Sequence, residues 1–116
     1  MEIIEFKDHF YNNIKNGVKT QTMRIPSHRL EIKEGDYVIG RFKTYQDTLL
    51  KITKTGYKMF KNINDDDAKR EGFNTAEELK NELLEIYKDK QILETSRVYY
   101  YQFKFKGFRF IWTKTK

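Results

Sequence analysis

The chain has 116 residues and a formal net charge of +6, and aromatic residues make up 16% of it. This length suits one domain that is able to bury a hydrophobic core. The absence of cysteine excludes disulfides and cysteine nucleophiles, and two histidines are too few for a histidine-rich metal site. No apolar run is long enough for a membrane span, and the first ten residues do not resemble a signal peptide. We therefore expect a single cytoplasmic domain over 1–116 that uses no metal or other cofactor.

The N-terminal half predicts a short helix followed by strands. Apolar residues recur at intervals of three and four, which places on one helical face the residues Ile3, Phe6, Phe10 and Ile14. Gly17 follows an asparagine and is a typical helix end. Segment 19–24 is rich in threonine and predicts a strand or an extended loop. Segments 37–43 and 48–55 predict two further strands.

The C-terminal half predicts two helices and a long strand pattern. Asn64 precedes three aspartates, as in a helix cap with acids in the first turn, and Gly72 ends that helix. Thr75 begins a capping box for a second helix, whose buried stripe is predicted to be Leu79, Leu83 and Ile86. Segment 98–112 alternates aromatic with basic or polar residues, and Lys106-Gly107 predicts a hairpin within it. These elements together indicate an α+β domain with a mostly antiparallel sheet or small barrel.

Charge is distributed unevenly along the chain. The net charge is +5 over 1–63, −4 over 64–90 and +5 over 91–116. The acidic middle is most simply the solvated face of the second predicted helix, made by Glu77, Glu78, Glu82 and Glu85. A nucleic-acid surface would therefore use the two basic ends of the chain.

The basic and aromatic residues near the C-terminus allow two interpretations. The basic residues Lys104, Lys106, Arg109 and Lys114 alternate with the aromatic residues Phe103, Phe105, Phe108, Phe110 and Trp112. Exposed aromatics between cations are typical of single-stranded RNA binding. A sheet with one buried face shows the same alternation, and we favour this interpretation. Three consecutive tyrosines, 99–101, cannot all point inward, so at least one is exposed or lines a cleft.

Segment 17–24, Gly-Val-Lys-Thr-Gln-Thr-Met-Arg, is the most unusual stretch. A threonine hydroxyl is a useful nucleophile when a base removes its proton, and a lysine can be that base if burial lowers its pKa. Regular strand alternation separates Lys19 from Thr22, so the two meet only if the chain bends after Gly17. Taken alone, the segment favours a helix end followed by a solvated edge strand.

Glu71 is a second candidate for a functional residue. It lies at the end of the first predicted C-terminal helix, where the helix dipole disfavours an acid. A carboxylate in that place is either retained for a task or is an ordinary exposed glutamate. Without further information, the exposed glutamate is the favoured interpretation.

These segments together resemble an ASCH domain, a branch of the PUA-like superfamily. The resemblance rests on the frame G-x-K-T-x-T-x-R at 17–24, E-G-D at 34–36, A-K-R-E-G-F at 68–73 and the T-A-E-E-L that follows, with Tyr87. It covers roughly 5–105 and leaves 106–116 as a basic-aromatic strand or extension. It implies a small, mostly antiparallel PUA-like β-barrel with two to three flanking helices. A cleft is expected where the first motif meets the helix that carries Glu71.

One bacterial branch with this frame comprises small amidohydrolases that deacetylate N4-acetylcytidine. The resemblance to that branch implies that Lys19, Thr22 and Glu71 are catalytic and that Thr20 and Arg24 bind substrate. We assign Thr22 as the nucleophile on the amide carbonyl and Lys19 as its base. Glu71 then orients Lys19 or delivers a proton to the leaving exocyclic amine, and the roles of Lys19 and Glu71 are interchangeable at this stage.

Two other functions remain open, because the wider ASCH family shares the frame. One is an RNA-binding module without turnover, which would contact single-stranded RNA through the basic ends of the chain. The other is a single-strand ribonuclease that uses Lys19 and a tyrosine near the cleft. The charge of +6 favours these two, whereas the match at three catalytic positions favours the hydrolase. The sequence leaves open the acyl group, the oligomeric state and whether the base is free or within RNA.

Overall fold

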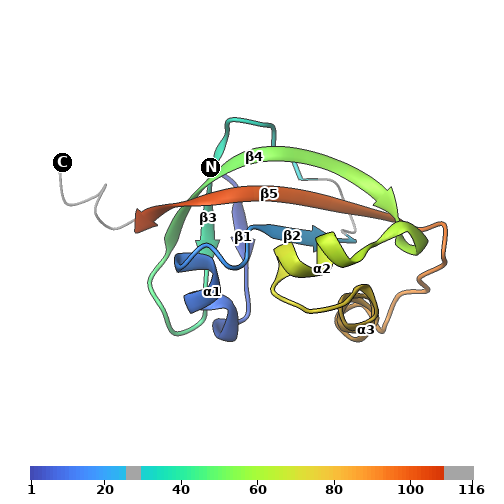
Figure 1. Ribbon diagram of the computed structural model, residues 1–116. Coiled ribbons are helices and arrows are strands. Elements are labelled where there is room, and N and C mark those ends of the chain that lie inside the picture. The colour runs from blue at the N-terminus through green and yellow to red at the C-terminus, as the bar shows by residue number, and fades with distance from the viewer. Residues whose placement is uncertain (26–29, 109–116) are drawn as a thin grey trace.

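The computed structural model describes residues 1–25 and 30–108 (Figure 1). Its strands are β1 (Ile3–Glu5), β2 (Gln21–Arg24), β3 (Tyr37–Arg41), β4 (Thr48–Met59) and β5 (Arg97–Phe108). Its α-helices are α1 (Tyr11–Lys15), α2 (Asp65–Glu71) and α3 (Ala76–Ile86), and short 3-10 helices cover Asp8–Phe10 and Phe60–Asn62. Within these residues no helix is long and apolar enough to cross a membrane.

The five strands form one sheet in the order β1-β3-β4-β5-β2. Only β1 and β3 pair in parallel, and the other neighbours are antiparallel. The long strands β4 and β5 form a curved central ribbon, and the three helices lie together on one side of it (Figure 1). The α+β class is confirmed. The described strands leave β1 and β2 as unpaired edges, so the sheet is not closed and the predicted barrel is not confirmed.

Two clusters of buried apolar side chains fill the space between the helices and the sheet. One includes Ile14 of α1 and Leu50, Ile52 and Phe103 of the central ribbon. The other joins Met23 of β2 to α2, α3 and β5 through Ala68, Leu79, Leu83 and Val98. Full burial of one large apolar side chain contributes about 1.5–3 kcal/mol, so the second cluster fixes α2 and α3 against β2.

The predicted ends of the helices are confirmed. Asn64 Oδ1 accepts a hydrogen bond from the Asp67 backbone N–H, and the Asp67 carboxylate accepts one from the Asn64 backbone N–H, which completes a capping box. At the start of α3, Thr75 Oγ1 accepts from the Glu78 N–H, so the cap is present; the Glu78 carboxylate accepts from the Thr75 hydroxyl rather than from the Thr75 N–H, so the predicted capping box is only half formed. Gly72 ends α2 at φ +92°, a left-handed conformation that favours glycine.

Three predictions of local structure are wrong. Ile3 does not belong to a helix; it lies in β1 with 39% of its surface exposed, and α1 begins only at Tyr11. The hairpin predicted at Lys106-Gly107 is absent, because β5 runs through both residues and pairs with β4 along most of its length. Ile86 is 47% exposed rather than part of the buried stripe of α3.

The aromatic alternation of β5 follows the pattern of a sheet with one buried face. Phe103 and Tyr101 are buried, whereas Lys104 and Lys106 are exposed. Tyr99 and Tyr100 are half-buried. The rest of the predicted basic-aromatic stretch lies outside the described residues, namely Arg109, Phe110, Trp112 and Lys114.

Candidate functional site

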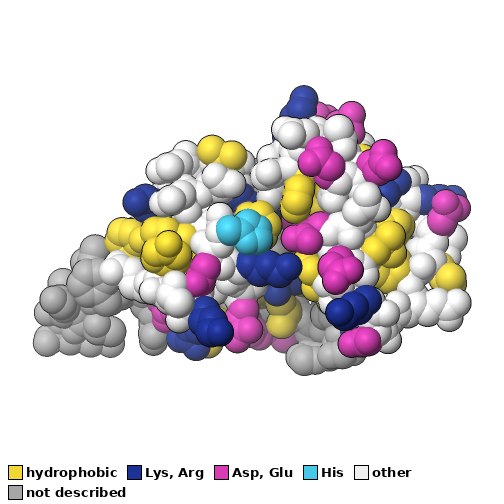
Figure 2. Space-filling model, turned by 90° about the horizontal axis from the view of Figure 1, so that it is seen from below, with side chains coloured by type: hydrophobic (Ala, Val, Ile, Leu, Met, Phe, Trp, Pro, Cys, Tyr) yellow, Lys and Arg dark blue, Asp and Glu magenta, His cyan; other side chains and the backbone are white. Residues whose placement is uncertain are grey.

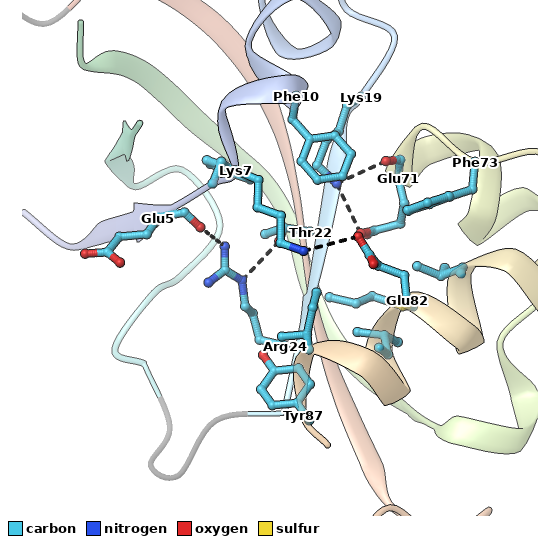
Figure 3. A pocket seen from close by; sticks show the side chains of 15 residues that line it. Glu5, Lys7, Phe10, Lys19, Thr22, Arg24, Glu71, Phe73, Glu82 and Tyr87 are labelled. Carbon is cyan, nitrogen blue, oxygen red and sulfur yellow. Dashed lines mark hydrogen bonds and ion pairs between the residues drawn. The ribbon is translucent and has the colours of Figure 1, made fainter. Parts of the chain in front are cut away.

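A cavity of about 160 Å³ lies between β2, α2, α3 and the segment that follows β1. Its polar and charged lining residues are Glu5, Lys7, Lys19, Thr22, Arg24, Glu71, Glu82 and Tyr87. The remaining lining residues are Phe6, Phe10, Met23, Phe73, Leu79, Leu83 and Ile86. Figure 3 shows the charged ends of Lys7, Lys19, Glu71 and Glu82 close together, with Phe10 and Phe73 beside them and Arg24 next to Thr22. This cavity therefore combines apolar walls with a few convergent polar groups, as ligand sites commonly do.

Lys19 enters the cavity because the chain turns before β2 begins. Gly17 adopts φ +78° after α1, and the next two backbone N–H groups, of Val18 and Lys19, both donate to the Asn13 carbonyl at 2.8 and 2.9 Å. The Thr20 N–H then donates to the Arg70 carbonyl of α2 at 2.8 Å. Strand alternation does not apply across this turn, so Lys19 and Thr22 line the same cavity.

The Lys19 ammonium is surrounded by acceptors from two elements. Its Nζ donates to the Gln21 carbonyl at 2.9 Å, and to the Glu71 carbonyl and Oε1, both at 3.2 Å. These three acceptors match the three N–H groups of a protonated lysine. Nζ also lies 4.5 Å from the centre of the Phe10 ring, within the range of a cation–π contact. Lys19 is only 3% exposed.

Glu71 is a buried residue and not the exposed glutamate that the sequence alone favoured. Only 4% of its surface is accessible. Lys19 lies at the C-terminal end of α2, where a cation is stabilised by the helix dipole and offsets the unfavourable position of the Glu71 carboxylate. No described group meets hydrogen-bond geometry at the buried Oε2 of Glu71, although the Gln21 side-chain amide and the Met23 backbone N–H lie near enough to favour the charged carboxylate.

Burial moves both groups of this pair toward their neutral forms. It lowers the pKa of Lys19, against the opposing effect of the Glu71 carboxylate. It also raises the pKa of Glu71, against the opposing effect of the Lys19 ammonium. Because both neutral forms are favoured, less free energy is needed to transfer a proton from Lys19 to Glu71. A general acid and base require this property.

Thr22 and Arg24 form the second polar group of the cavity. Thr22 is 4% exposed, and its Oγ1 accepts a hydrogen bond from Arg24 Nε at 3.1 Å. The guanidinium also donates to the Glu5 carbonyl and lies 5.6 Å from the Phe6 ring centre. Burial lowers the pKa of Arg24, and no carboxylate within 1–25 and 30–108 forms an ion pair with it. The cavity thus holds a cation that is available for an anion or a developing negative charge.

The cavity mouth contains a charged pair that sequence reasoning missed. Lys7 Nζ and Glu82 Oε2 are 3.7 Å apart, and the Glu82 side chain is 23% exposed. Glu82 therefore lines the cavity and is not part of a fully solvated helix face as predicted. No signal in the sequence singles out Lys7, because its place depends on the turn between β1 and α1.

Four of the five predicted site residues thus meet in one cavity, and the fifth does not. Lys19, Thr22, Arg24 and Glu71 line one cavity, whereas Thr20 is half-buried and outside the lining. Thr20 instead uses its backbone carbonyl to accept from the Phe103 N–H. No hydrogen bond between described atoms joins Lys19 to Thr22 directly. Within 1–25 and 30–108, no group of three or more histidine, aspartate or glutamate side chains is placed so that it could hold a metal ion.

The face of the molecule that carries the helices has no uniform charge. Figure 2 shows acidic, basic and hydrophobic side chains interspersed across it. An extended phosphate backbone is attracted by a continuous positive surface. The mixed surface instead suits recognition of a small group within the cavity.

Comparisons with known proteins give similarity of structure and not of sequence. No family model matches the chain, and no curated protein sequence does so. A crystal structure of an Enterococcus faecalis protein, described with the family DUF984, has a TM-score of 0.75 and 17% identity, covering 98% of this chain and 81% of that one. An ASCH domain from Lactobacillus crispatus has a TM-score of 0.70 and 13% identity, with coverages of 90% and 78%. The hypothetical protein PH0355 has a TM-score of 0.70 and 18% identity, with coverages of 91% and 100%. The chain therefore has an ASCH-like fold.

Proposed function

We propose that the protein is an amide hydrolase that removes the acyl group from N4-acetylcytidine or a related modified pyrimidine. One observation carries this proposal: Lys19, Thr22 and Glu71 are each at most 4% exposed and line the same cavity. A nucleophile, a base and a second proton carrier are the groups that amide cleavage requires.

In the first step, Thr22 Oγ attacks the carbonyl carbon of the substrate amide, and its proton passes to the base. The bond from that carbon to the exocyclic nitrogen then breaks, and the nitrogen leaves as an amine after it receives a proton. In the second step, water attacks the acyl-threonine and releases the carboxylic acid. Threonine and the proton carriers are restored, so the cycle consumes one water per amide.

Lys19 is proposed as the base and Glu71 as its proton partner. Lys19 can accept a proton from Thr22 only in its neutral form, and burial lowers its pKa and so favours this form. The Oε1 of Glu71, 3.2 Å from Nζ, can take the proton that Lys19 must lose beforehand. The exchanged assignment, with Glu71 as the base, uses the same contacts.

Arg24 is proposed to stabilise negative charge at the reacting oxygen atoms. Its Nε already donates to Thr22 Oγ1 at 3.1 Å, so the hydrogen bond strengthens as that oxygen loses its proton.

The size and lining of the cavity support a small planar substrate group. Its volume of about 160 Å³ is below the roughly 300–1,000 Å³ of pockets that hold drug-sized ligands. Phe10, Phe73 and Tyr87 offer aromatic surfaces against which a pyrimidine can pack. The acylated base would occupy the cavity, and the ribose would lie at the mouth near Lys7 and Glu82.

The direct test is hydrolysis of N4-acetylcytidine by the purified protein, followed by the absorbance change to cytidine. We expect turnover by the wild type, none by Thr22→Val, and residual turnover by Thr22→Ser, which keeps the hydroxyl. Circular dichroism and thermal unfolding establish that each variant is folded. No turnover by the wild type would overturn the proposed substrate. Equal turnover by Thr22→Val would overturn the proposed nucleophile.

RNA binding is a second candidate, and the register of the central ribbon favours it. Lys51 of β4 and Lys104 of β5 are directly opposite each other, an arrangement that repulsion makes unfavourable. Lys104 and Lys106 are exposed and form no ion pair with a described carboxylate. Binding of single-stranded RNA that weakens steeply with salt, and that Lys104→Gln reduces, would support this function. The same affinity at low and high salt would contradict it.

A further inference from the structure

A chain of buried polar side chains lies behind the cavity and takes no part in the proposed chemistry. Gln102 Nε2 donates to Gln21 Oε1 at 3.0 Å, and Gln21 Nε2 donates to Asp67 Oδ1 at 3.4 Å. Asp67 Oδ2 accepts from Lys58 Nζ at 2.6 Å and from the Asn64 N–H at 3.1 Å. Gln21 and Asp67 are 0% and 2% exposed. A hydrogen-bonded network at this depth is costly to leave half-made, so it strongly fixes relative positions.

This network holds the same two elements that meet at the candidate site. Asp67 and Glu71 are one helical turn apart and therefore lie on the same face of α2. Asp67 contacts the side chain of Gln21, whereas Glu71 contacts Lys19. The Gln21 carbonyl is itself an acceptor for Lys19 Nζ. Gln21 of β2 thus contacts Lys19 directly and, through Asp67, contacts the helix that carries Glu71.

The short length of α2 makes such an anchor necessary. A helix of seven residues is unstable alone, so its position depends on contacts with the rest of the fold. Ala68 supplies the only apolar side chain of α2, and it is fully buried. Asp67 and Glu71 supply its other buried side chains. The polar contacts of Asp67 therefore act together with the hydrogen bond from the Thr20 N–H to the Arg70 carbonyl, and with the apolar cluster around Ala68, to hold Glu71 along β2.

We propose that Asp67, acting through Gln21, is a positioning residue that holds Glu71 against Lys19. The proposal rests on the proposed function, because the pair being positioned is the base and its proton partner. It assigns no contact with substrate to Asp67, which lies outside the cavity lining. The Gln21 side-chain amide also acts on Glu71 directly. Burial raises the pKa of Glu71, and this amide is among the groups that oppose the rise.

The test compares Asp67→Asn with Asp67→Ala. Both variants remove the negative charge and its ion pairs with Lys58 and Arg70, but only asparagine keeps an oxygen that accepts from Gln21. A difference between the two variants therefore reports position and not charge. The readout is the titration of Lys19 and Glu71 side chains by NMR of carbon-13-labelled protein. The other charged groups that face the pair, Arg24 of β2 and Glu82 of α3, are unchanged in both variants.

We expect Lys19 to titrate about one pH unit or more lower in Asp67→Ala than in Asp67→Asn, because the Glu71 carboxylate that raises its pKa is no longer held. We also expect kcat on N4-acetylcytidine to fall roughly 10- to 100-fold in Asp67→Ala relative to Asp67→Asn, with KM unchanged. Identical titrations in the two folded variants would overturn the positioning role. Absence of turnover in the wild type would overturn the proposed function alone, because the titration needs no substrate.

A second pair of variants covers the case in which Asp67→Ala does not fold. Gln21→Met removes the amide beside Asp67 at nearly constant volume, and Gln102→Met removes the amide on the other side of Gln21. We expect Gln21→Met to displace the titration of Lys19 and Gln102→Met to leave it as in the wild type. A folded Gln21→Met protein with the wild-type titration would overturn the proposal.

Discussion

Lys19 Nζ donates to both the backbone carbonyl and the carboxylate of Glu71, each at 3.2 Å, although 52 residues separate them in the sequence. The same ammonium therefore completes the end of α2 and neutralises the side chain that the helix dipole disfavours there. Removing two charges from water costs several kcal/mol per ion, which a buried pair regains only in part. The presence of this buried pair is thus weak evidence that it stabilises the fold.

Removal of one member of this pair should destabilise the fold more than removal of both. Lys19→Met leaves the Glu71 carboxylate buried without a counter-charge, and we expect a loss of about 3–5 kcal/mol in the free energy of unfolding. The double variant Lys19→Met with Glu71→Leu should regain most of that loss. Urea unfolding at neutral pH measures all three proteins. A double variant that is no more stable than Lys19→Met would contradict this account.

The free energy of unfolding should depend on pH through two buried groups, Glu71 and Lys19. Burial raises the pKa of Glu71 above its ordinary 4.5, so the folded state binds this proton more tightly and its contribution to stability falls as pH rises from there. Burial lowers the pKa of Lys19 below its ordinary 10.5, so its unfavourable contribution is relieved as pH rises toward 10.5. In Glu71→Gln the contribution of the Glu71 carboxyl group is lost. The unfavourable contribution of the Lys19 ammonium grows, because Lys19 no longer has a counter-charge.

The stability of Glu71→Gln relative to the wild type should therefore increase with pH between about pH 5 and pH 9. Urea unfolding at several pH values measures the difference, with Glu78→Gln as a control at an exposed glutamate whose removal should give a nearly constant difference. If the stability of Glu71→Gln relative to the wild type instead falls as pH rises, burial does not raise the pKa of Glu71.

Gly72 should be necessary for the position of Glu71 as well as for stability. It adopts φ +92°, and an added Cβ would make only ordinary contacts, with Asn13 Nδ2 at 3.6 Å and Phe10 Cε1 at 4.0 Å, so the cost of Gly72→Ala is conformational and about 1–2 kcal/mol. Gly35→Ala is the matched control, because Gly35 has φ +90° and open space around it. Both variants should lose similar stability in urea unfolding. Only Gly72→Ala should change the NMR titration of Lys19; an equal change in both would contradict this prediction.

Glu82 should shift the pKa of the proposed base, Lys19, without being essential for its action. Burial lowers the pKa of Lys19, and the Glu82 carboxylate is among the groups that raise it. If neutral Lys19 is the base, Glu82→Gln should move the acid limb of the kcat/KM profile to lower pH. Stability should change by less than about 1 kcal/mol, because the pair with Lys7 is partly exposed.

Glu85→Gln is the control for this prediction. Glu85 lies on the same helix with a side chain that is 73% exposed, and it pairs with Lys88 at 3.8 Å. Its removal should leave the pH profile of activity in place. An acid limb that moves to higher pH in Glu82→Gln would show that Lys19 does not act as the base.

Local signals in the sequence were sufficient wherever a structure depends on residues only a few positions apart. The cap at Asn64, the cap at Thr75 and the left-handed helix end at Gly72 were predicted and are present. The reason is that these hydrogen bonds and backbone conformations form within one helical turn. The resemblance in the motif frame also placed Lys19, Thr22 and Glu71 among the site residues, and their catalytic roles stay predictions.

Only the tertiary structure decided which of these side chains meet. Ile3 fits a helical spacing, yet its segment gains parallel pairing with β3, a partner more than thirty residues away in the sequence. Lys106-Gly107 fits a turn, yet the ladder with β4 extends through it. The burial of Glu71 and the turn that brings Lys19 beside Thr22 depend likewise on hydrogen bonds between α2 and the segment before β2. These contacts form only when residues distant in the sequence meet away from water, so neither segment alone carries a signature of them.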